Sequence, residues 1–110
     1  MPACSFDFSK GLTDVGTFLA TSRVLENTGV MAYDGAIRFI ENRDLVQAGA
    51  TIATVEARHA AYFNLINRAS PFPDAFDTPK KPSDIITAVL ATGFVTDCPP
   101  LAKELFARLP

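Results

Sequence analysis

The longest regular pattern in the chain is a seven-residue repeat that continues without a proline from Thr13 to Glu41. Such spacing predicts a helix over about residues 13–41 with one buried stripe. The stripe consists of Leu12, Leu19, Glu26, Tyr33 and Ile40. Its companions three residues further on would let a neighbouring helix approach closely, and they are Val15, Ser22, Gly29 and Ala36. Glu26 is the one residue of the stripe that is charged at neutral pH.

A second helical pattern follows after a short interruption at Asn42 and Arg43. Asp44 with Gln47 three residues later resembles a capping box, which predicts a helix over about residues 45–67. One heptad series contains Leu45, Ile52, His59 and Ile66, and the adjacent series contains Gly49, Glu56 and Phe63. Because the link is short, we expect the two helices to be antiparallel neighbours.

The remaining chain predicts a proline-rich loop and two short helices. Residues 70–82, SPFPDAFDTPKKP, contain four of the eight prolines and exclude a regular helix or central strand. We expect an ordered loop that shields Phe72 and Phe76 from water. Short helices are predicted at about residues 84–95 and 101–108, separated by the Cys98-Pro99-Pro100 break.

Two long helices alone make a poor core, because stable bundles normally use four. Either the segment after Ser70 folds back as a lid, or a second chain completes the bundle. The fold class predicted from the pattern is therefore all-α, with a long helical hairpin as its main element.

Composition narrows the class of protein. The 110 residues are 48% hydrophobic, carry a formal net charge of −2, and fit one small domain. Without a basic patch or a long apolar run, we expect neither nucleic acid nor membrane as a partner. The opening segment MPACSFDFSK predicts no signal peptide, and the compartment stays open. Cys4 and Cys98 fit a disulfide or two reduced thiols.

Three ligand-type residues fall on the two predicted core stripes, namely Glu26, Glu56 and His59. A buried carboxylate destabilises the fold unless it is protonated, paired or bound to a metal ion. Removing the partner of a buried charge costs about 3–5 kcal/mol. Carboxylate oxygens and an imidazole nitrogen suit iron, with manganese as a second choice. Glu56 and His59 form a Glu-x-x-His pair on one helix face, a motif of di-metal helical bundles.

A simpler interpretation stays open beside the metal site. A single histidine on an apolar helix face is commonly a hydrogen-bonded core or interface residue, and Arg58 could pair with one of the acids. With one histidine in the chain, the sequence offers no Ser/His/Asp or Cys/His constellation. It has no glycine-rich phosphate loop either.

Four segments resemble a known family. LENTGVMAYDGA (25–36), ATIATVEARHAAYF (50–63), PFPDAFDTP (71–79) and FVTDCP (94–99) are similar to the C-terminal half of ferritin-like desiccation-related proteins of plants and bacteria and their fungal stress-response relatives. The resemblance covers about residues 18–99. It implies a ferritin-like four-helix bundle in which two helices each give a Glu and two others each give a Glu-x-x-His.

In this resemblance, Glu26 corresponds to the single Glu of the third helix, and Glu56 with His59 to the pair of the fourth. Helices corresponding to the first two are absent, so residues 1–110 form a partial ferritin-like domain with three of the six ligands. Two copies related by a two-fold axis would restore six ligands, which makes a homodimer an expected partner. Relatives are often exported, and disulfides form in exported proteins. The resemblance therefore makes a Cys4–Cys98 disulfide worth testing.

The expected function is therefore that of an iron-binding ferritin-like protein. It would oxidise or sequester iron during desiccation or oxidative stress, with Glu26 and His59 as terminal ligands and Glu56 as a bridging one. The alternatives are a stress-related scaffold without metal, in which Glu56 and His59 pair with neighbours, and a non-functional fragment.

Overall fold

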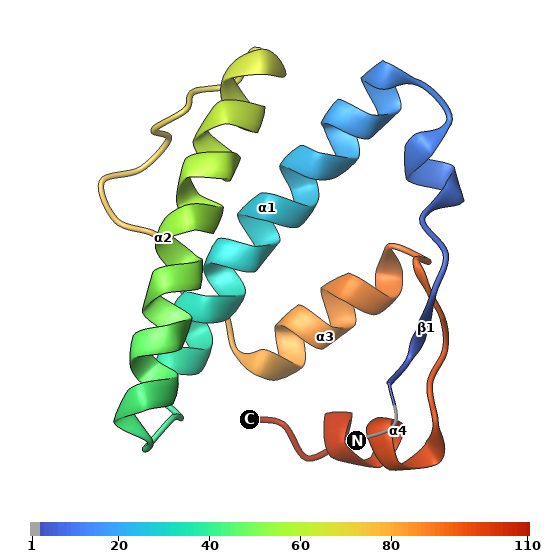
Figure 1. The fold of residues 1–110 in the computed structure, drawn as a ribbon, viewed down its shortest axis with the longest axis vertical. Coiled ribbons are helices and arrows are strands. Elements are labelled where there is room, and N and C mark those ends of the chain that lie inside the picture. The colour runs from blue at the N-terminus through green and yellow to red at the C-terminus, as the bar shows by residue number, and fades with distance from the viewer. Residues whose placement is uncertain (1–2) are drawn as a thin grey trace.

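The computed structural model describes residues 3–110 and is mostly helical. Two long helices joined by a short turn form its centre, and the smaller elements lie to one side of them (Figure 1). In chain order the elements are β1 (Ser5–Phe6), the 3-10 helix η1 (Ser9–Leu12), α1 (Val15–Ile37), α2 (Arg43–Ile66), α3 (Pro82–Ala91), β2 (Val95–Asp97) and α4 (Pro100–Phe106).

Both long helices begin at a side-chain cap. The carboxylate of Asp14 accepts a hydrogen bond from the backbone N–H of Thr17 at 2.8 Å, so α1 starts at Val15. The side chain of Asn42 accepts from the N–H groups of Asp44 and Leu45. The cap of α2 is therefore Asn42, two residues before the predicted Asp44, because either side chain can accept from free N–H groups.

The ends of the long helices are tightened by short-range hydrogen bonds. After α1, Phe39 and Ile40 donate to carbonyl groups three residues earlier, and this turn ends the helix before the predicted Glu41. After α2, Arg68 adopts a positive φ of 62° and Ala69 donates to the carbonyl of Asn64. This left-handed residue stops the helix and sends the chain into the proline-rich loop.

The interface between α1 and α2 is built from small residues and amides. Val30, Ala53 and Ala60 are buried, and Asn64 is only 4% exposed. Asn64 Oδ1 accepts from Arg23 Nε and Asn27 Nδ2, both at 3.0 Å, so its buried amide is satisfied. No large side chain within residues 3–110 is completely buried. The hairpin thus has a thin core, as two isolated helices must.

The proline-rich loop lies against α1 through its last residues. The backbone N–H of Lys80 donates to the carbonyl of Met31 at 3.1 Å, and the Lys80 carbonyl approaches the helix at Gly35. Phe72 and Phe76, in contrast, are 80% and 88% exposed, so the expectation that the loop shields them is wrong. Residues 3–110 therefore leave most of both rings in contact with water.

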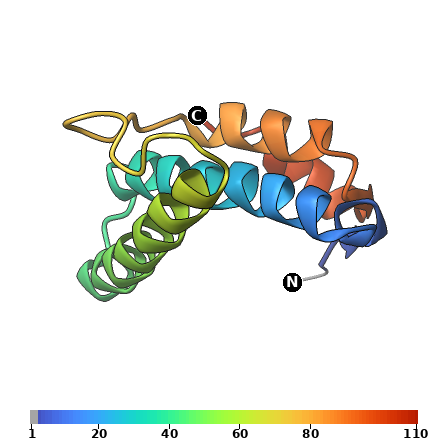
Figure 2. The same cartoon turned by 90° about the horizontal axis from the view of Figure 1, so that it is seen from above.

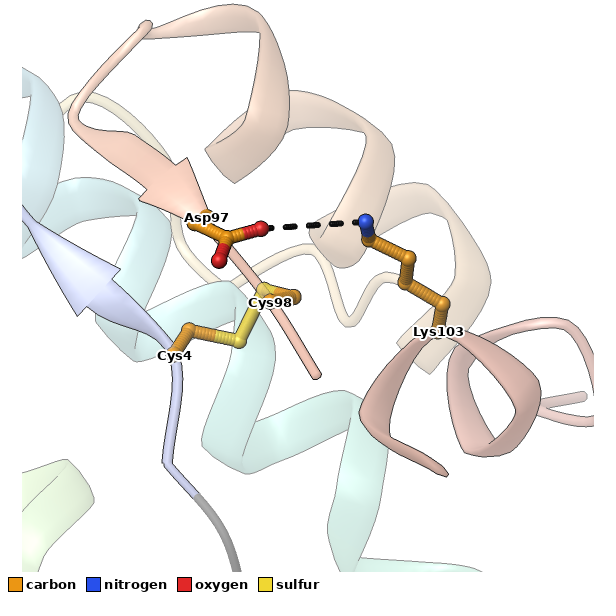
Figure 3. Close-up of a disulfide and its surroundings, with 4 residues drawn as sticks. All are labelled: Cys4, Asp97, Cys98 and Lys103. Carbon is orange, nitrogen blue, oxygen red and sulfur yellow. Dashed lines mark ion pairs between the residues drawn. A yellow bond between two sulfur atoms is a disulfide. The ribbon is translucent and has the colours of Figure 1, made fainter. Parts of the chain in front are cut away.

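The C-terminal segment returns to the start of the chain. Cys4 and Cys98 form a disulfide across 94 positions of sequence, beside the antiparallel pair β1–β2 (Figure 3). Nearby, Lys103 on α4 forms an exposed ion pair with Asp97 at 3.8 Å. The predicted helix over 84–95 is wrong at its end, since α3 stops at Ala91 and Val95 belongs to β2.

The open face of the hairpin is the side of the α1–α2 pair opposite α3 and the proline-rich loop, both of which lie together in Figure 2. Its apolar α2 side chains are 37% to 62% exposed, and they are Leu45, Ile52, Val55 and Tyr62. Its α1 residues are the exposed ring of Phe18 and the smaller Ser22, Gly29 and Ala36. No helix in residues 3–110 combines the length and apolar character that a membrane span requires.

Candidate metal centre

The three predicted ligand residues meet where α1 and α2 face each other. Glu26 projects from α1, and Glu56 and His59 come from successive turns of α2. His59 Nδ1 lies 3.3 Å from Glu26 Oε2, which is a direct contact between the helices. The sequence pattern therefore places these residues correctly relative to one another.

The cluster opens to solvent on the side of His59. The His59 side chain is 55% exposed, whereas that of Glu26 is 24% exposed and Glu56 is half-buried. Val55 and Tyr62 lie one turn before and after His59 and flank it on the open face. A solute can thus reach the imidazole without any rearrangement of the backbone.

Glu56 is the most perturbed group of the cluster. Burial raises the pKa of its carboxyl, the neighbouring charge of Glu26 and hydrogen bonding with Glu26 raise it further, and His59 opposes the rise. Repulsion between two close carboxylates favours the protonated form of Glu56. Glu26 in turn contacts His59.

Gly29 makes room for the Glu56 carboxylate. A Cβ built at Gly29 would overlap Glu56 Oε2 and would lie 2.8 Å from Cδ of the same side chain. Glycine thus lets the carboxylate rest directly against the α1 backbone, three residues from Glu26 on the same helix. The sequence shows Gly29 as one of the small residues beside the stripe of the first long helix. From the sequence we predicted only that it lets a neighbouring helix approach closely.

The residue types of the cluster suit a transition metal, but their positions do not form a complete metal site. Carboxylate oxygens and an imidazole nitrogen form a donor set that suits iron or manganese. Yet nowhere in residues 3–110 do three or more His, Cys, Asp or Glu side chains form a group positioned to hold a metal ion. The residue types and their proximity fit a metal, whereas one chain in this conformation supplies an incomplete cage.

Other candidate partners lie apart from the cluster. Arg58 is exposed, and the ion pairs of the described residues are His59–Glu26, Lys103–Asp97 and Arg108–Glu104, so the predicted pairing of Arg58 with an acid is absent there. A cavity of about 210 Å³ under the proline-rich loop is lined by Asn27, Asn64 and Asp77 among others, but by none of the three candidate ligands. Sequence analysis did not find this amide-lined cavity.

Comparison with known proteins gives one match. A family model described as "Ferritin-like domain" matches residues 1–68, which include α1, α2 and all three candidate ligands. No curated protein matches the chain.

Proposed function

Because this chain belongs to the ferritin-like domain family, we propose that Glu26, Glu56 and His59 bind iron, and that the protein oxidises or sequesters it. The observation that supports the proposal most directly is the 3.3 Å approach of His59 Nδ1 to Glu26 Oε2 beside Glu56. The resemblance to desiccation-related and fungal stress proteins suggests that this activity belongs to desiccation or oxidative stress.

The residues have distinct roles in this proposal. Glu26 and Glu56 supply negative oxygens that balance the charge of the ion, and His59 supplies a neutral nitrogen through its ring. Bound iron would supply reversible exchange between its ferrous and ferric states. Manganese fits the same donors.

Proton release accompanies binding in this scheme. The pKa of Glu56 is raised by burial and by Glu26, so a cation must compete with a proton at this carboxyl. His59 must also be neutral, and the ring nitrogen that carries no proton must face the ion. Binding should therefore weaken as pH falls and should release protons to the buffer.

One observation favours a second candidate function, that of a scaffold without metal. Glu26 and His59 already contact one another at 3.3 Å, and the described residues contain no three-ligand group. In that case the Glu26–His59 contact and the buried amide of Asn64 would hold the two helices in register. The ferritin-like hairpin would then act by binding a partner or protecting one.

Metal titration separates the two functions. We expect Mn²⁺, followed by electron paramagnetic resonance, and anaerobic Fe²⁺, followed by calorimetry, to bind to the purified chain. Glu56→Gln and His59→Ala should each abolish or strongly weaken this binding. Arg58→Ala is the matched control, because Arg58 is exposed beside His59 in sequence and belongs to no ion pair among the described residues.

The scaffold function is supported instead if the folded wild-type chain takes up neither ion. Circular dichroism of each variant checks that α1 and α2 are intact, so that lost binding is not lost folding. Binding that survives in both Glu56→Gln and His59→Ala would place the metal elsewhere and contradict the proposal.

A further inference from the structure

We propose that the cavity under the proline-rich loop binds a small organic ammonium ion that carries a hydroxyl or amide group at its other end. The cavity has a volume of about 210 Å³ and lies between the loop and the α1–α2 pair. None of the three candidate metal ligands lines it, so this site is separate from the proposed iron function. Pockets for drug-sized ligands measure about 300–1,000 Å³, so the ligand must be smaller than those.

The cavity exists because α2 presents small side chains to the loop. Ala57, Ala60 and Ala61 line it from α2, where larger side chains would fill the space. Apolar walls of this kind can cover the short hydrocarbon part of a ligand. The other apolar walls come from α1 and from the loop, and they are Val30, Met31, Pro71 and Pro73.

Backbone hydrogen bonds hold the loop to the long helices on both sides of the cavity. Just before the loop, the N–H of Ala69 donates to the carbonyl of Asn64 at 2.9 Å. Near its end, the N–H of Lys80 donates to the carbonyl of Met31 at 3.1 Å. Both acceptors belong to residues that line the cavity. The cavity is therefore formed before a ligand arrives, and binding need not order the loop.

Two asparagine amides form the polar floor of the cavity. Asn64 is 4% exposed, and its Oδ1 accepts from Arg23 Nε and Asn27 Nδ2, both at 3.0 Å. Because a guanidinium group only donates, the contact with Arg23 identifies this atom of Asn64 as the oxygen. Asn64 Nδ2 donates one of its two protons to Asn27 Oδ1 at 3.3 Å. The hydrogen bonds within residues 3–110 thus leave one N–H of Asn64 and one lone pair of Asn27 Oδ1 for a ligand, which suits a hydroxyl or amide group.

The mouth of the cavity is acidic. Asp74 and Asp77 line it from the exposed part of the loop, and no lysine or arginine is among the described residues that line it. Asp34 on α1 lies within reach of the same charge, since burial raises the pKa of its carboxyl and the negative charge of Asp77 adds to the rise. An ammonium ion at the mouth would be attracted to both loop carboxylates, whereas an anion would be repelled.

Nuclear magnetic resonance of the isotope-labelled full chain, with its disulfide intact and chelator present, tests the proposal. The probe is aminobutanol, which has an ammonium and a hydroxyl group at opposite ends of its carbon chain. We expect saturable shifts in the side-chain amide signals of Asn27 and Asn64 and in the backbone N–H of Asp77. The backbone N–H of Lys103 on α4 should not move, because Lys103 does not line this cavity.

Three related probes test the two ends of the ligand separately. Butanediol has a hydroxyl in place of the ammonium group, and it should bind about fivefold more weakly, the loss expected for an exposed charge pair. Butylamine lacks the hydroxyl and should lose about as much, because the amides of the floor are then covered without a partner. Hydroxybutyrate carries a negative charge and should give no saturable shift.

Two pairs of variants locate the site. Ala61→Leu puts a larger side chain into the cavity and should abolish binding, whereas Ala48→Leu, at an exposed position of the same helix, should leave affinity unchanged. Asp77→Asn should weaken the binding of aminobutanol by about fivefold and leave that of butanediol unchanged. Glu104→Gln, at an exposed position of α4, is its control and should change neither. Circular dichroism checks the helix content of each variant, and Asp77→Asn keeps the test decisive if Ala61→Leu does not fold.

The outcomes concern this cavity and not the iron site. Absence of a saturable shift with aminobutanol, or shifts confined to residues outside the cavity, overturns the proposal. Equal affinities for aminobutanol and butanediol, or an affinity for aminobutanol that Asp77→Asn leaves unchanged, overturn the assignment of an ammonium ligand. Each of these results leaves the metal titration of Glu56 and His59 to be decided by itself.

Discussion

The carboxylate of Glu56 on α2 occupies the space beside α1 that a side chain at Gly29 would need. This relationship makes a glycine, which carries no ligand atom, part of the candidate site. A substitution at Gly29 can therefore displace the Glu56 carboxylate without removing it. Such a variant tests the position of the candidate ligand, which substitutions of Glu56 itself cannot do.

Gly29→Ala should lower metal affinity while preserving the fold. The added methyl overlaps the flexible end of Glu56, which must turn away from its present place. We expect affinity for Mn²⁺ to fall by about 10-fold or more, the range seen when the support of a metal ligand is changed. The free energy of unfolding of Gly29→Ala should equal that of the wild type or exceed it by up to about 1 kcal/mol, because alanine favours a helix more than glycine does.

Gly49→Ala is the matched control for this variant. A Cβ at Gly49 meets nothing closer than Tyr33 Cδ1 at 3.9 Å, so the substitution adds helix propensity without displacing a neighbour. It should raise the free energy of unfolding and leave Mn²⁺ affinity unchanged. Equal affinities in Gly29→Ala and Gly49→Ala would show that the position of Glu56 does not matter for binding.

Gly35→Ala should destabilise the protein, unlike the other two glycine variants. A Cβ there would collide with the backbone carbonyl group of Lys80 and would lie 2.7 Å from its carbon. Backbone atoms cannot rotate away, so the loop must leave α1 and lose the Lys80–Met31 hydrogen bond. We expect a loss of about 2 kcal/mol in the free energy of unfolding, measured in urea. A stability equal to that of Gly49→Ala would contradict the packing of the loop.

Removal of the disulfide should lower stability without removing metal binding. The bond closes a loop of 94 positions, so the Cys4→Ser/Cys98→Ser double variant should lose about 2–4 kcal/mol. Thermal unfolding of the wild type with reductant should match the variant, which itself should not respond to reductant. Hydrogen exchange should increase in β1, β2 and α4. A melting temperature that reductant leaves unchanged would contradict this expectation.

The contribution of Asp34 to the free energy of unfolding should decrease with rising pH. Burial raises the pKa of this carboxyl above its usual 3.8, and the negative charge of Asp77 adds to the rise. The folded chain thus binds the proton more tightly than the unfolded chain. The favourable contribution is complete below the unfolded pKa and is lost as pH rises through the folded pKa.

Asp34→Asn should remove this penalty. The variant should melt at a higher temperature than the wild type at pH 7 and should differ less from it at pH 3. The gain should stay below about 1 kcal/mol, because water screens a partly exposed carboxylate. Asp77→Asn should give a change in the same direction. A lower melting temperature for Asp34→Asn at pH 7 would contradict the stated origin of the shift.

The sequence predicted the hairpin well because its information is local. The heptad spacing predicts two long helices, and Asn42 supplies a cap within a few residues of the helix it starts. The predicted buried stripe of α2 is wrong, however, since Leu45, Ile52 and His59 are exposed. The buried positions of α2 are Ala53, Ala60 and Asn64. From the same spacing we predicted that Glu26, Glu56 and His59 face one another across the two helices. Periodicity carries this information because residues three, four and seven apart share one face of a helix.

The parts that the sequence did not predict depend on distant partners. Val95 was assigned to a helix, but it pairs with Phe6 across most of the chain, and strands of two and three residues leave almost no alternation to detect. Whether Phe72 and Phe76 are covered likewise depends on what surrounds the loop. The amides of Asn27 and Asn64 meet across 37 positions, which no local pattern shows.

The disulfide also determines what a break in the backbone would do. The proline-rich loop is exposed from Phe72 to Lys81, so it is the natural place for a protease to enter. A cut there would separate the long hairpin from α3 and α4 in sequence. Cys4 and Cys98 lie on opposite sides of the cut, so the two pieces would still migrate as one molecule until a reductant released them.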